Sequence, residues 1–423
     1  MRAPSANEER KTILDIQLIR RDPDAVRAAL ARRGPAAAAA IDRVLELDER
    51  WRALRTELES LQAEQNAASK GRKGPPTPEE RERLAELAAR GRALSDEETS
   101  VRAQRDSELA ALPALPSPEA PDEDTVLREV GQAGATGRDH LELAGPRIDM
   151  EAAARTSGSR FAYIKGDLVM LELALVHYAL DKLRAQGFEP VIPPVLVREQ
   201  ALYGTGMLPD TEHQIYRLAD DDLYLAGTSE VPLASLHAGE IIAGEALPIR
   251  YAGFSPCFRR EAGAAGKDTR GIFRVHQFDK VEMFSFVEPE EGQAEHERLL
   301  EIEESILQDL EIPYRVVAIA VNDLGASASM KYDCEAWLPG QGRYRELTST
   351  SNTTDYQSRR LDIRYRPAEG RPAPVYTLNG TAVAVGRTII ALLENGQQDD
   401  GSVRLPAALT PYGAPAVLPA APA

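Results

Sequence analysis

The sequence contains only two cysteines, Cys257 and Cys334, among 423 residues. Two thiols cannot build a disulfide framework, and neither stands in the CxxC or Cys/His spacing of a zinc site. We therefore expect both to be reduced, structural thiols. The six histidines show no HxxxH or HExxH spacing and no GxSxG elbow occurs, which argues against a zinc enzyme and against a serine hydrolase.

Long apolar runs are also missing. No window of about 18 apolar residues exists to span a bilayer, and residues 1–12, MRAPSANEERKT, lack the apolar core of a signal peptide. We expect a soluble cytoplasmic protein with no membrane partner. Basic residues are also fewer than acidic ones, 50 against 67, which gives a formal net charge of −17. No general basic field would attract nucleic acid, so a polyanion would have to be bound locally.

The length of the chain favours more than one domain. Composition changes near residue 113, where LPALPSPEAPDEDT concentrates proline and acidic residues, as linkers do. We predict an N-terminal domain over 1–112, a linker over 113–135 and a second domain over 136–423.

Heptad spacing predicts a helical hairpin over residues 41–112. Apolar residues recur at alternating steps of three and four before the breaker KGRKGPPTPEE, and a second run follows it. At 1.5 Å per residue, arms of about 30 residues would each extend roughly 45 Å. The hairpin carries 13 basic and 16 acidic residues, with Lys70, Arg72 and Lys73 at its tip. The pattern fits a dimerising coiled coil as well as an arm that contacts phosphates, and it leaves that choice open.

Beyond residue 145 the sequence consists of short apolar runs separated by glycine and proline, with helices between them. Several runs alternate as antiparallel strands do, and they lack regular βαβ spacing. This predicts an α+β fold in which helices flank an antiparallel β-sheet. No Rossmann fingerprint or P-loop occurs, so ATP would need another kind of site.

Residues 258–284, FRREAGAAGKDTRGIFRVHQFDKVEMF, place six cationic side chains around a glycine-rich turn. As a hairpin, this segment puts Arg259 and Arg274 near its two ends. Period-two alternation puts Arg274, Phe278 and Glu282 on one face. That face offers a guanidinium for phosphate, a ring for stacking and a carboxylate for an ammonium group. A cross-strand salt-bridge ladder is the alternative reading of the segment alone.

Three segments carry a family resemblance. FRREAG with RGIFRVHQFDKVEMF resembles motif two of the class II aminoacyl-tRNA synthetases, and TLNGTAVAVGRTIIALLEN resembles motif three. The helix before EPVIPPVLV, with that run and Pro194, is similar to motif one. AGTSEVPLASLH, ELTSTSNTTDYQSRRLDIRYR and the N-terminal helical hairpin resemble the serine-specific branch. The resemblance implies a class II catalytic domain joined to an N-terminal coiled-coil arm that binds tRNA.

The resemblance also implies site residues. Arg259, Arg274 and Arg387 would be catalytic, and Glu346 and Ser349 would hold Mg²⁺ against the phosphates. The ATP set would comprise Arg259, Arg260, Glu261, Arg274, Val275, Phe278, Glu346, Leu347, Thr348, Ser349 and Arg387. The serine set would comprise Thr228, Ser229, Glu230, Arg259, Glu282, Asn379 and Thr381. Lys70, Arg72 and Lys73 would contact tRNA.

The implied activity is ATP-dependent activation of L-serine to seryl-adenylate and transfer to the 3′ end of tRNA(Ser). Whether tRNA(Sec) is charged as well would depend on the host. The segment around 168–197 would form a homodimer through motif one. Two alternatives remain: a synthetase-like paralogue that loads an amino acid onto a carrier protein, and an inactive interaction protein. The long arm disfavours the first, and the intact motifs disfavour the second.

Overall fold

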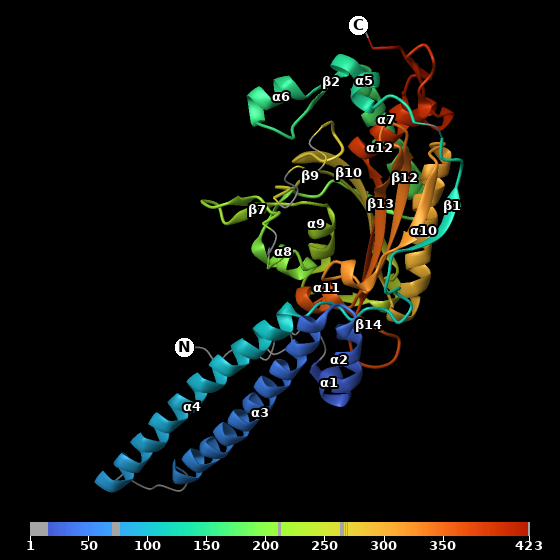
Figure 1. Cartoon of the computed structure of the whole chain (residues 1–423). Coiled ribbons are helices and arrows are strands. Elements are labelled where there is room, and N and C mark those ends of the chain that lie inside the picture. The colour runs from blue at the N-terminus through green and yellow to red at the C-terminus, as the bar shows by residue number, and fades with distance from the viewer. Residues whose placement is uncertain are drawn as a thin grey trace. The chain divides into compact units, whose positions relative to one another are not determined.

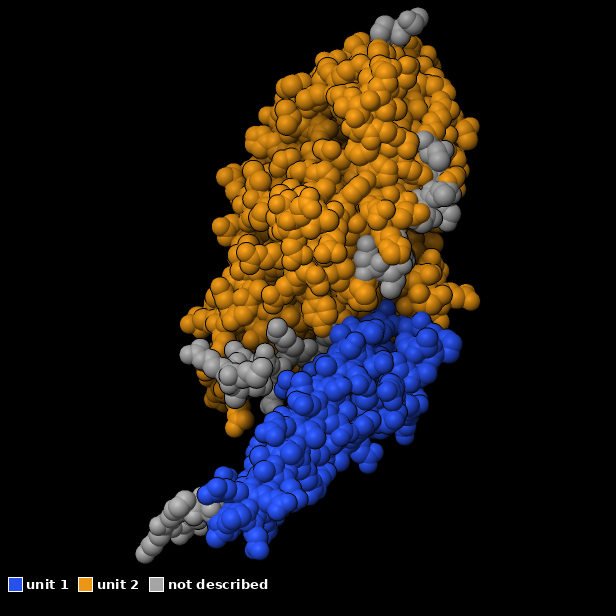
Figure 2. All heavy atoms as spheres, turned by 90° about the vertical axis from the view of Figure 1, so that its left-hand side faces the viewer, with its two compact units in different colours: residues 1–115 blue, residues 116–423 orange. Residues whose placement is uncertain are grey.

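The computed structural model describes residues 16–69, 77–134, 136–209, 213–262, 266, 268 and 270–421. The chain divides into two compact units, residues 1–115 and 116–423, shown in blue and orange (Figure 2). The tip residues Lys70, Arg72 and Lys73 lie outside the described residues, so the expectation about them stays a prediction.

The first unit is helical, as predicted. It comprises α1 (Ile16–Arg21), α2 (Pro23–Ala31), α3 (Pro35–Ser69) and α4 (Pro78–Ala111). α3 and α4 are antiparallel, because Trp51 bonds Glu98 at 2.7 Å while, further along, Gln65 bonds the carbonyl of Leu87 at 2.8 Å. α4 begins with a capping box in which the Thr77 hydroxyl accepts from the amide of Glu80. The two long helices form the predicted hairpin (Figure 1).

Two apolar clusters hold the helical unit together. The heptad positions make a seam along the hairpin that buries Leu47, Leu54, Leu61, Leu87, Leu94 and Val101. A second cluster lies at the base and joins the hairpin to α1 and α2 through Ile19, Val26, Leu30, Ile41, Val44, Leu109 and Leu112. Between them the fully buried Asp48 pairs with Arg20 at 2.7 Å and with Arg105 at 3.4 Å. This carboxylate therefore joins α1, α3 and α4.

The second unit is built on an eight-stranded sheet with the order β1-β11-β12-β13-β16-β10-β9-β4. Its strands are β1 (Thr125–Val130), β4 (Glu189–Val191), β9 (Ile249–Phe258), β10 (Gln277–Val287), β11 (Tyr314–Ala318), β12 (Met330–Leu338), β13 (Arg343–Thr354) and β16 (Tyr376–Ala384). All neighbours are antiparallel except β4 and β9. The predicted α+β class is confirmed, with one parallel pair at an edge that alternation could not reveal.

The segment expected to be a linker has more structure than its composition indicates. Residues 125–130 form β1, which pairs with β11 and closes one edge of the sheet. Its side chains are mostly exposed, so the strand lacks the apolar alternation that predicts a strand. The boundary between the compact units accordingly falls at residue 115.

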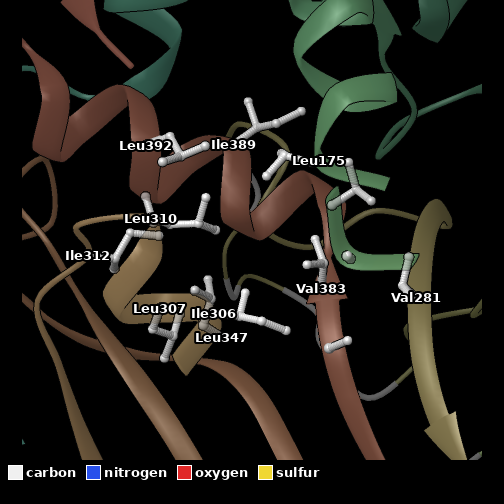
Figure 3. Close-up of a cluster of buried hydrophobic side chains, with 14 of the residues drawn as sticks. Leu175, Val281, Ile306, Leu307, Leu310, Ile312, Leu347, Val383, Ile389 and Leu392 are labelled. Carbon is white, nitrogen blue, oxygen red and sulfur yellow. The ribbon is translucent and has the colours of Figure 1, made fainter. Parts of the chain in front are cut away.

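Three helices cover one face of the sheet: α7 (Asp167–Ala185), α10 (Gly292–Asp309) and α12 (Val385–Gly396). Leu175 of α7, Leu307 of α10 and Ile389 of α12 meet in one apolar core (Figure 3). Val281 and Val383 enter the same core from β10 and β16. Burial of these side chains is the main stabilisation of the unit, because each removes apolar surface from water.

Four register shifts interrupt the sheet, and two of these β-bulges bear on the same region of β13 and β16. Between β12 and β13 the register passes from the pair Cys334–Thr348 to the pair Glu335–Glu346, which leaves Leu347 as the extra residue. Between β10 and β16 it passes from Val281–Val383 to Glu282–Thr381, which leaves Ala382 as the extra residue. A bulge puts two successive side chains on the same face and reverses the alternation beyond it.

Smaller elements surround the sheet. The helices are α5 (His140–Ala144), α6 (Met150–Ser157), α8 (Glu199–Thr205), α9 (Glu230–Ala234) and α11 (Tyr356–Leu361). The short strands are β2 (Ile148–Asp149), β3 (Tyr163–Ile164), β5 (Leu196–Val197), β6 (Arg217–Leu218), β7 (Leu223–Leu225), β8 (Ile241–Ala243), β14 (Arg364–Arg366), β15 (Ala373–Pro374), β17 (Val403–Arg404) and β18 (Val417–Leu418). Among the described helices, none has the length and apolarity that a bilayer crossing requires.

Candidate active site

A cleft opens on the face of the sheet opposite the helical layer. It is lined by Arg259, Glu261, Ile272, Phe273, Arg274, Val275, Phe278, Lys280, Glu346, Leu347, Ser349, Thr381, Ala384, Gly386 and Arg387. The strands β9, β10, β13 and β16, which are adjacent in the sheet, carry or flank most of these residues. The segments named from their resemblance to motifs two and three therefore meet in one place.

The bulges explain why residues of odd spacing share this cleft. Glu346 and Ser349 are three apart on β13, so strict alternation would put them on opposite faces. The bulge places the buried Leu347 and Thr348 toward the helical layer, where Leu347 joins the apolar core while still bordering the cleft and Thr348 bonds Glu303, and it returns Ser349 to the cleft. On β16 the second bulge likewise places Ala382 and Val383 in the apolar core. Thr381 and Ala384, on either side of them, therefore both line the cleft.

Three arginines converge on the cleft. Arg259 follows β9 and donates from Nε to the carbonyl of Gly227 at 3.2 Å. Arg274 pairs with Glu261, with 2.7 Å between Nη1 and Oε2. Arg387 of α12 donates from Nη1 to the carbonyl of Glu346 at 3.0 Å. Guanidinium groups held in such a cluster suit a ligand with several negative oxygens, such as a triphosphate.

The aromatic rings of the cleft lie beside these cations. The guanidinium of Arg259 is 5.4 Å from the ring centroid of Phe278, and that of Arg387 is 4.6 Å from the centroid of Phe273. A flat base can stack between a ring and a guanidinium plane. The site thus offers a place for a base next to a place for phosphates.

The cleft also suits magnesium held jointly with a nucleotide. Within the described residues, no group of three or more His, Cys, Asp or Glu side chains is arranged to hold a metal ion. Mg²⁺ instead commonly binds through one or two protein oxygens together with substrate phosphates. Glu346 and Ser349 supply such oxygens on the cleft wall. Burial opposes ionisation of Glu346, but the nearby charges of Arg387 and Lys331 outweigh burial and lower the pKa of this carboxyl group. The ionised form, which is the form that binds a metal ion, is therefore favoured.

Deeper in the site lies an acidic group. The buried Glu230 of α9 accepts at Oε1 from the amides of Asn379, at 2.9 Å, and Gln357, at 2.7 Å. Burial and the neighbouring Glu282 carboxylate raise the pKa of Glu230 to about 7. Glu282 is buried against Lys280, and burial raises its pKa as well. Two buried carboxylates flanked by amides form a suitable environment for a small ammonium group.

Most of the predicted site residues come together here. Ten of them line the cleft: Arg259, Glu261, Arg274, Val275, Phe278, Glu346, Leu347, Ser349, Thr381 and Arg387. Thr228 lines an adjoining pocket that shares Arg259, Glu261, Arg274 and Arg387 with it. Glu230, Glu282 and Asn379 form the acidic end, where Glu282 pairs with Thr381 across the strands.

Three predicted residues point elsewhere. Arg260 is exposed, and its amide bonds the carbonyl of Gln214 at 2.8 Å. The Thr348 side chain is buried on the helical side of the sheet, where its hydroxyl bonds Glu303. The Ser229 hydroxyl donates to the carbonyl of Gly253 at 3.3 Å. The side chains of Thr348 and Ser229 thus serve the scaffold, while that of Arg260 is exposed to solvent.

The predicted alternation around Arg274 does not hold in the structure. β10 begins only at Gln277, so Arg274 and Val275 belong to the preceding loop and both line the cleft. His276 lies beside Phe161, and its Nδ1 bonds the carbonyl of Arg259 at 2.9 Å. The period-two argument fails there because it assumed a strand that starts too early.

Sequence reasoning missed several residues of the site. Lys280 has the same parity as Phe278 and Glu282, so alternation could have found it. Gln357 lies in the quoted segment SNTTDYQSRR and bonds Glu230. Arg345 stacks on Phe273 with 3.8 Å to the ring centroid, although its parity on β13 differs from that of Glu346.

Comparison with known proteins shows which family the chain resembles. Residues 13–116 match the model of the seryl-tRNA synthetase N-terminal domain, and residues 214–396 match the tRNA synthetase class II core domain (G, H, P, S and T). The serine–tRNA ligase of Streptomyces coelicolor is 51% identical over 416 residues, which cover 95% of this chain and 97% of that relative.

The chain belongs to the seryl-tRNA synthetase family. Among solved structures, the seryl-tRNA synthetase of Pyrococcus horikoshii complexed with ATP superposes with a TM-score of 0.91, at 41% identity over 97% of this chain and 100% of that one. The cytoplasmic serine–tRNA ligase of Naegleria fowleri in complex with AMP gives a TM-score of 0.87, at 31% identity over 97% of this chain and 99% of that one. The class II fold and the N-terminal helical arm of this chain thus agree with solved structures of its family.

Proposed function

We propose that this protein activates L-serine with ATP and transfers the seryl group to the 3′ end of tRNA(Ser). The observation that carries the proposal is the junction of two subsites: an arginine cluster for phosphates, and a buried carboxylate pair for an ammonium group. Thr381 of β16 lines the phosphate cleft and pairs with Glu282 of β10. The strand β16 therefore borders both subsites. The family relationship supplies serine and tRNA as the substrates.

In the first step, a carboxylate oxygen of serine attacks the α-phosphorus of ATP and pyrophosphate leaves. Arg259 grips the α-phosphate and the attacking carboxylate, and Arg274 and Arg387 hold the terminal phosphate. The adenine stacks on Phe278 beneath Arg387, and its amino group donates to Glu261. Glu346 and Ser349 would hold Mg²⁺ together with the nucleotide, and the ion would supply neutralisation of phosphate charge. The protein contributes position and charge stabilisation and needs no covalent nucleophile.

Serine selection rests on the acidic end of the site. Glu230, Glu282 and Thr228 hold the ammonium group, and Asn379 and Thr381 bond the hydroxyl. A site built to hydrogen-bond a hydroxyl disfavours an analogue without one, because its own polar groups are then left unpaired. Free L-alanine, which lacks the hydroxyl group, is the amino acid that tests this discrimination.

In the second step, the 3′-hydroxyl of the terminal tRNA adenosine attacks the seryl carbonyl and AMP leaves. We propose that residues 1–112 bind the body of the tRNA through the α3–α4 hairpin, and that the tip residues Lys70, Arg72 and Lys73 contribute phosphate contacts. Charging of tRNA(Sec) would follow in a host that makes that tRNA. We also place the enzyme in the cytoplasm, as the name of the Naegleria relative states for that protein.

ATP–pyrophosphate exchange across the twenty amino acids tests the proposal. We expect exchange with serine alone, followed by charging of tRNA(Ser) when tRNA is added. Serine exchange without tRNA charging would instead favour a carrier-protein ligase. Absence of exchange with every amino acid would favour an inactive interaction protein.

A further inference from the structure

A buried glutamate outside the proposed substrate contacts lies behind the cleft. Glu303 is on α10, in the helical layer, and is fully buried. Its Oε2 accepts a hydrogen bond from the Thr348 hydroxyl at 2.9 Å. Its Oε1 has no hydrogen-bond partner of normal geometry among the described residues. A buried carboxyl group that is only partly satisfied is costly, so its presence calls for an explanation.

The surroundings of Glu303 are the two bulges. Thr348 is one of the two residues that the β13 bulge turns toward the helical layer, and it is the one that bonds Glu303. A Cβ placed on Gly380 of β16 would lie 3.0 Å from Glu303 Oε1, so the carboxyl group also packs directly against the backbone of that strand. Gly380 directly precedes Thr381, where the second bulge begins.

Electrostatics indicate the form in which Glu303 acts. Burial raises its pKa well above the ordinary value, and Glu282 and Asp333 raise it further. The Thr348 hydroxyl and the backbone amide of Thr381 favour the ionised form but do not outweigh these effects. Burial is thus the largest influence on Glu303, and it favours the neutral form of the carboxyl group. A neutral carboxyl group can contact both strands without adding a negative charge behind Glu282.

We propose that Glu303 is a positioning residue for both substrates: from behind the sheet it fixes the two bulges that aim Glu346 and Ser349 at ATP and Thr381 at serine. The strands β13 and β16 are neighbours, and Glu303 lies where their irregular segments meet. Loss of its hydrogen bond lets the β13 bulge relax and moves the magnesium ligands. This inference rests on the proposed function, because it assumes that serine and ATP occupy the cleft.

Two substitutions that keep the volume of the side chain test the inference. Glu303→Met fills the space and removes the acceptor, and Thr348→Val removes the donor with little change of shape. We expect each to lower kcat for serine-dependent pyrophosphate exchange at least about tenfold and to raise the KM for both substrates. Because both changes break one hydrogen bond, the double variant should be no worse than either single variant. Glu303→Gln keeps a neutral acceptor and should stay within about threefold of the wild-type protein.

Glu304 provides the matched control. It is a buried glutamate on the same helix, but it bonds Arg128 of β1 and Tyr314 of β11, away from the cleft. Glu304→Gln should lower the thermal midpoint while leaving both KM values within about twofold. The inference is overturned if folded Glu303→Met retains wild-type kinetic constants, if the double variant shows additive losses, or if Glu304→Gln gives the same rise in KM. If the wild-type protein itself shows no serine exchange, the proposed function fails instead.

Discussion

Arg259 shows how the site concentrates charge on single residues in a protein that is acidic overall. Its guanidinium is fixed from one side by the Gly227 carbonyl and lies beside the Phe278 ring. It lines both the nucleotide cleft and the adjoining pocket. A residue that borders two subsites is in a position to contact both reacting groups at once.

Replacement of Arg259 by alanine should therefore lower adenylate formation by at least about 100-fold, the scale of losing one transition-state charge donor. Single-turnover formation of seryl-adenylate measures this directly. Arg404→Ala is the matched control, because that arginine is exposed on β17, where it pairs with Glu311. A variant lacking the Arg259 side chain that formed adenylate at the wild-type rate would contradict the assigned role.

Glu230 leads to a prediction about pH. Its pKa of about 7 results from burial and from Glu282, and a bound ammonium group would favour the ionised form. Serine should therefore bind tightly above about pH 7, where Glu230 is already ionised. Below that pH the free enzyme must lose a proton before binding, so the KM for serine should rise up to about tenfold per pH unit.

Exchange assays between pH 5.5 and 8.5 would show this rise in the KM for serine, while the KM for ATP should follow a different curve. Glu230→Gln should raise the KM for serine at every pH and flatten its pH dependence. A wild-type KM for serine that stays constant across this range would mean that Glu230 does not hold the ammonium group.

At the scale of elements, a feature could be predicted from the sequence where its pattern of residues is regular. The hairpin could be predicted because its seam repeats over several turns, and the cleft strands could be located because each carries a recognisable motif. The relation of Glu346 to Ser349 could not be derived, because a bulge breaks the alternation on which such reasoning depends. β1 was missed because an exposed edge strand carries no apolar alternation. Glu303 was missed because its significance lies in contacts between α10 and distant strands.

The two ends of the predicted hairpin, residues 41–112, also pack against the short helices α1 and α2, and this affects how the hairpin can be removed. Ile41, Val44, Leu109 and Leu112 belong to the base cluster with α1 and α2. Joining residue 40 to residue 113, which removes the whole predicted hairpin, would therefore expose that cluster. A milder excision removes residues 59–90 and joins Leu58 to Gly91 through a short glycine-rich turn. It leaves the base cluster and the Trp51–Glu98 bond intact.

In this shortened variant, serine-dependent pyrophosphate exchange should stay within a few-fold of wild type, because the cleft lies in the second unit. Charging of tRNA should fall by orders of magnitude through a raised KM for tRNA, and high tRNA concentration should restore part of it. Neutralising Lys70, Arg72 and Lys73 should have a milder effect and should reduce the slope of log affinity against log salt by roughly 0.7 to 0.9 per lost contact. Normal charging by the shortened variant would show that the hairpin serves packing or another partner.

At the scale of the whole molecule, one apolar surface of the catalytic unit remains uncovered within the described chain. Val169, Met170 and Leu173 lie on α7, and their exposed fractions are 38%, 49% and 56%. Ile192, directly after β4, is 82% exposed. The opposite side of α7 is packed into the core through Leu168, Leu171 and Leu175. A helix that is apolar on both sides commonly has a partner on each. These exposed residues belong to the segment that resembles motif one, so we propose a homodimer formed through this surface.

Light scattering at micromolar concentration should then give a mass near twice 46.2 kDa. Paired substitutions Met170→Asp and Leu173→Asp should shift the protein to the monomer, because two buried charges per subunit would lie in a two-fold interface.

Val417→Asp is the control, since Val417 is 49% exposed on β18, outside this surface. A wild-type particle of about 46.2 kDa with full activity would contradict the homodimer. A dimer that survives the paired substitutions would place the interface on another surface. If monomerisation also abolishes serine exchange while the fold persists, the contact across α7 contributes to the geometry of the cleft, since α7 packs against the same core as β10 and β16.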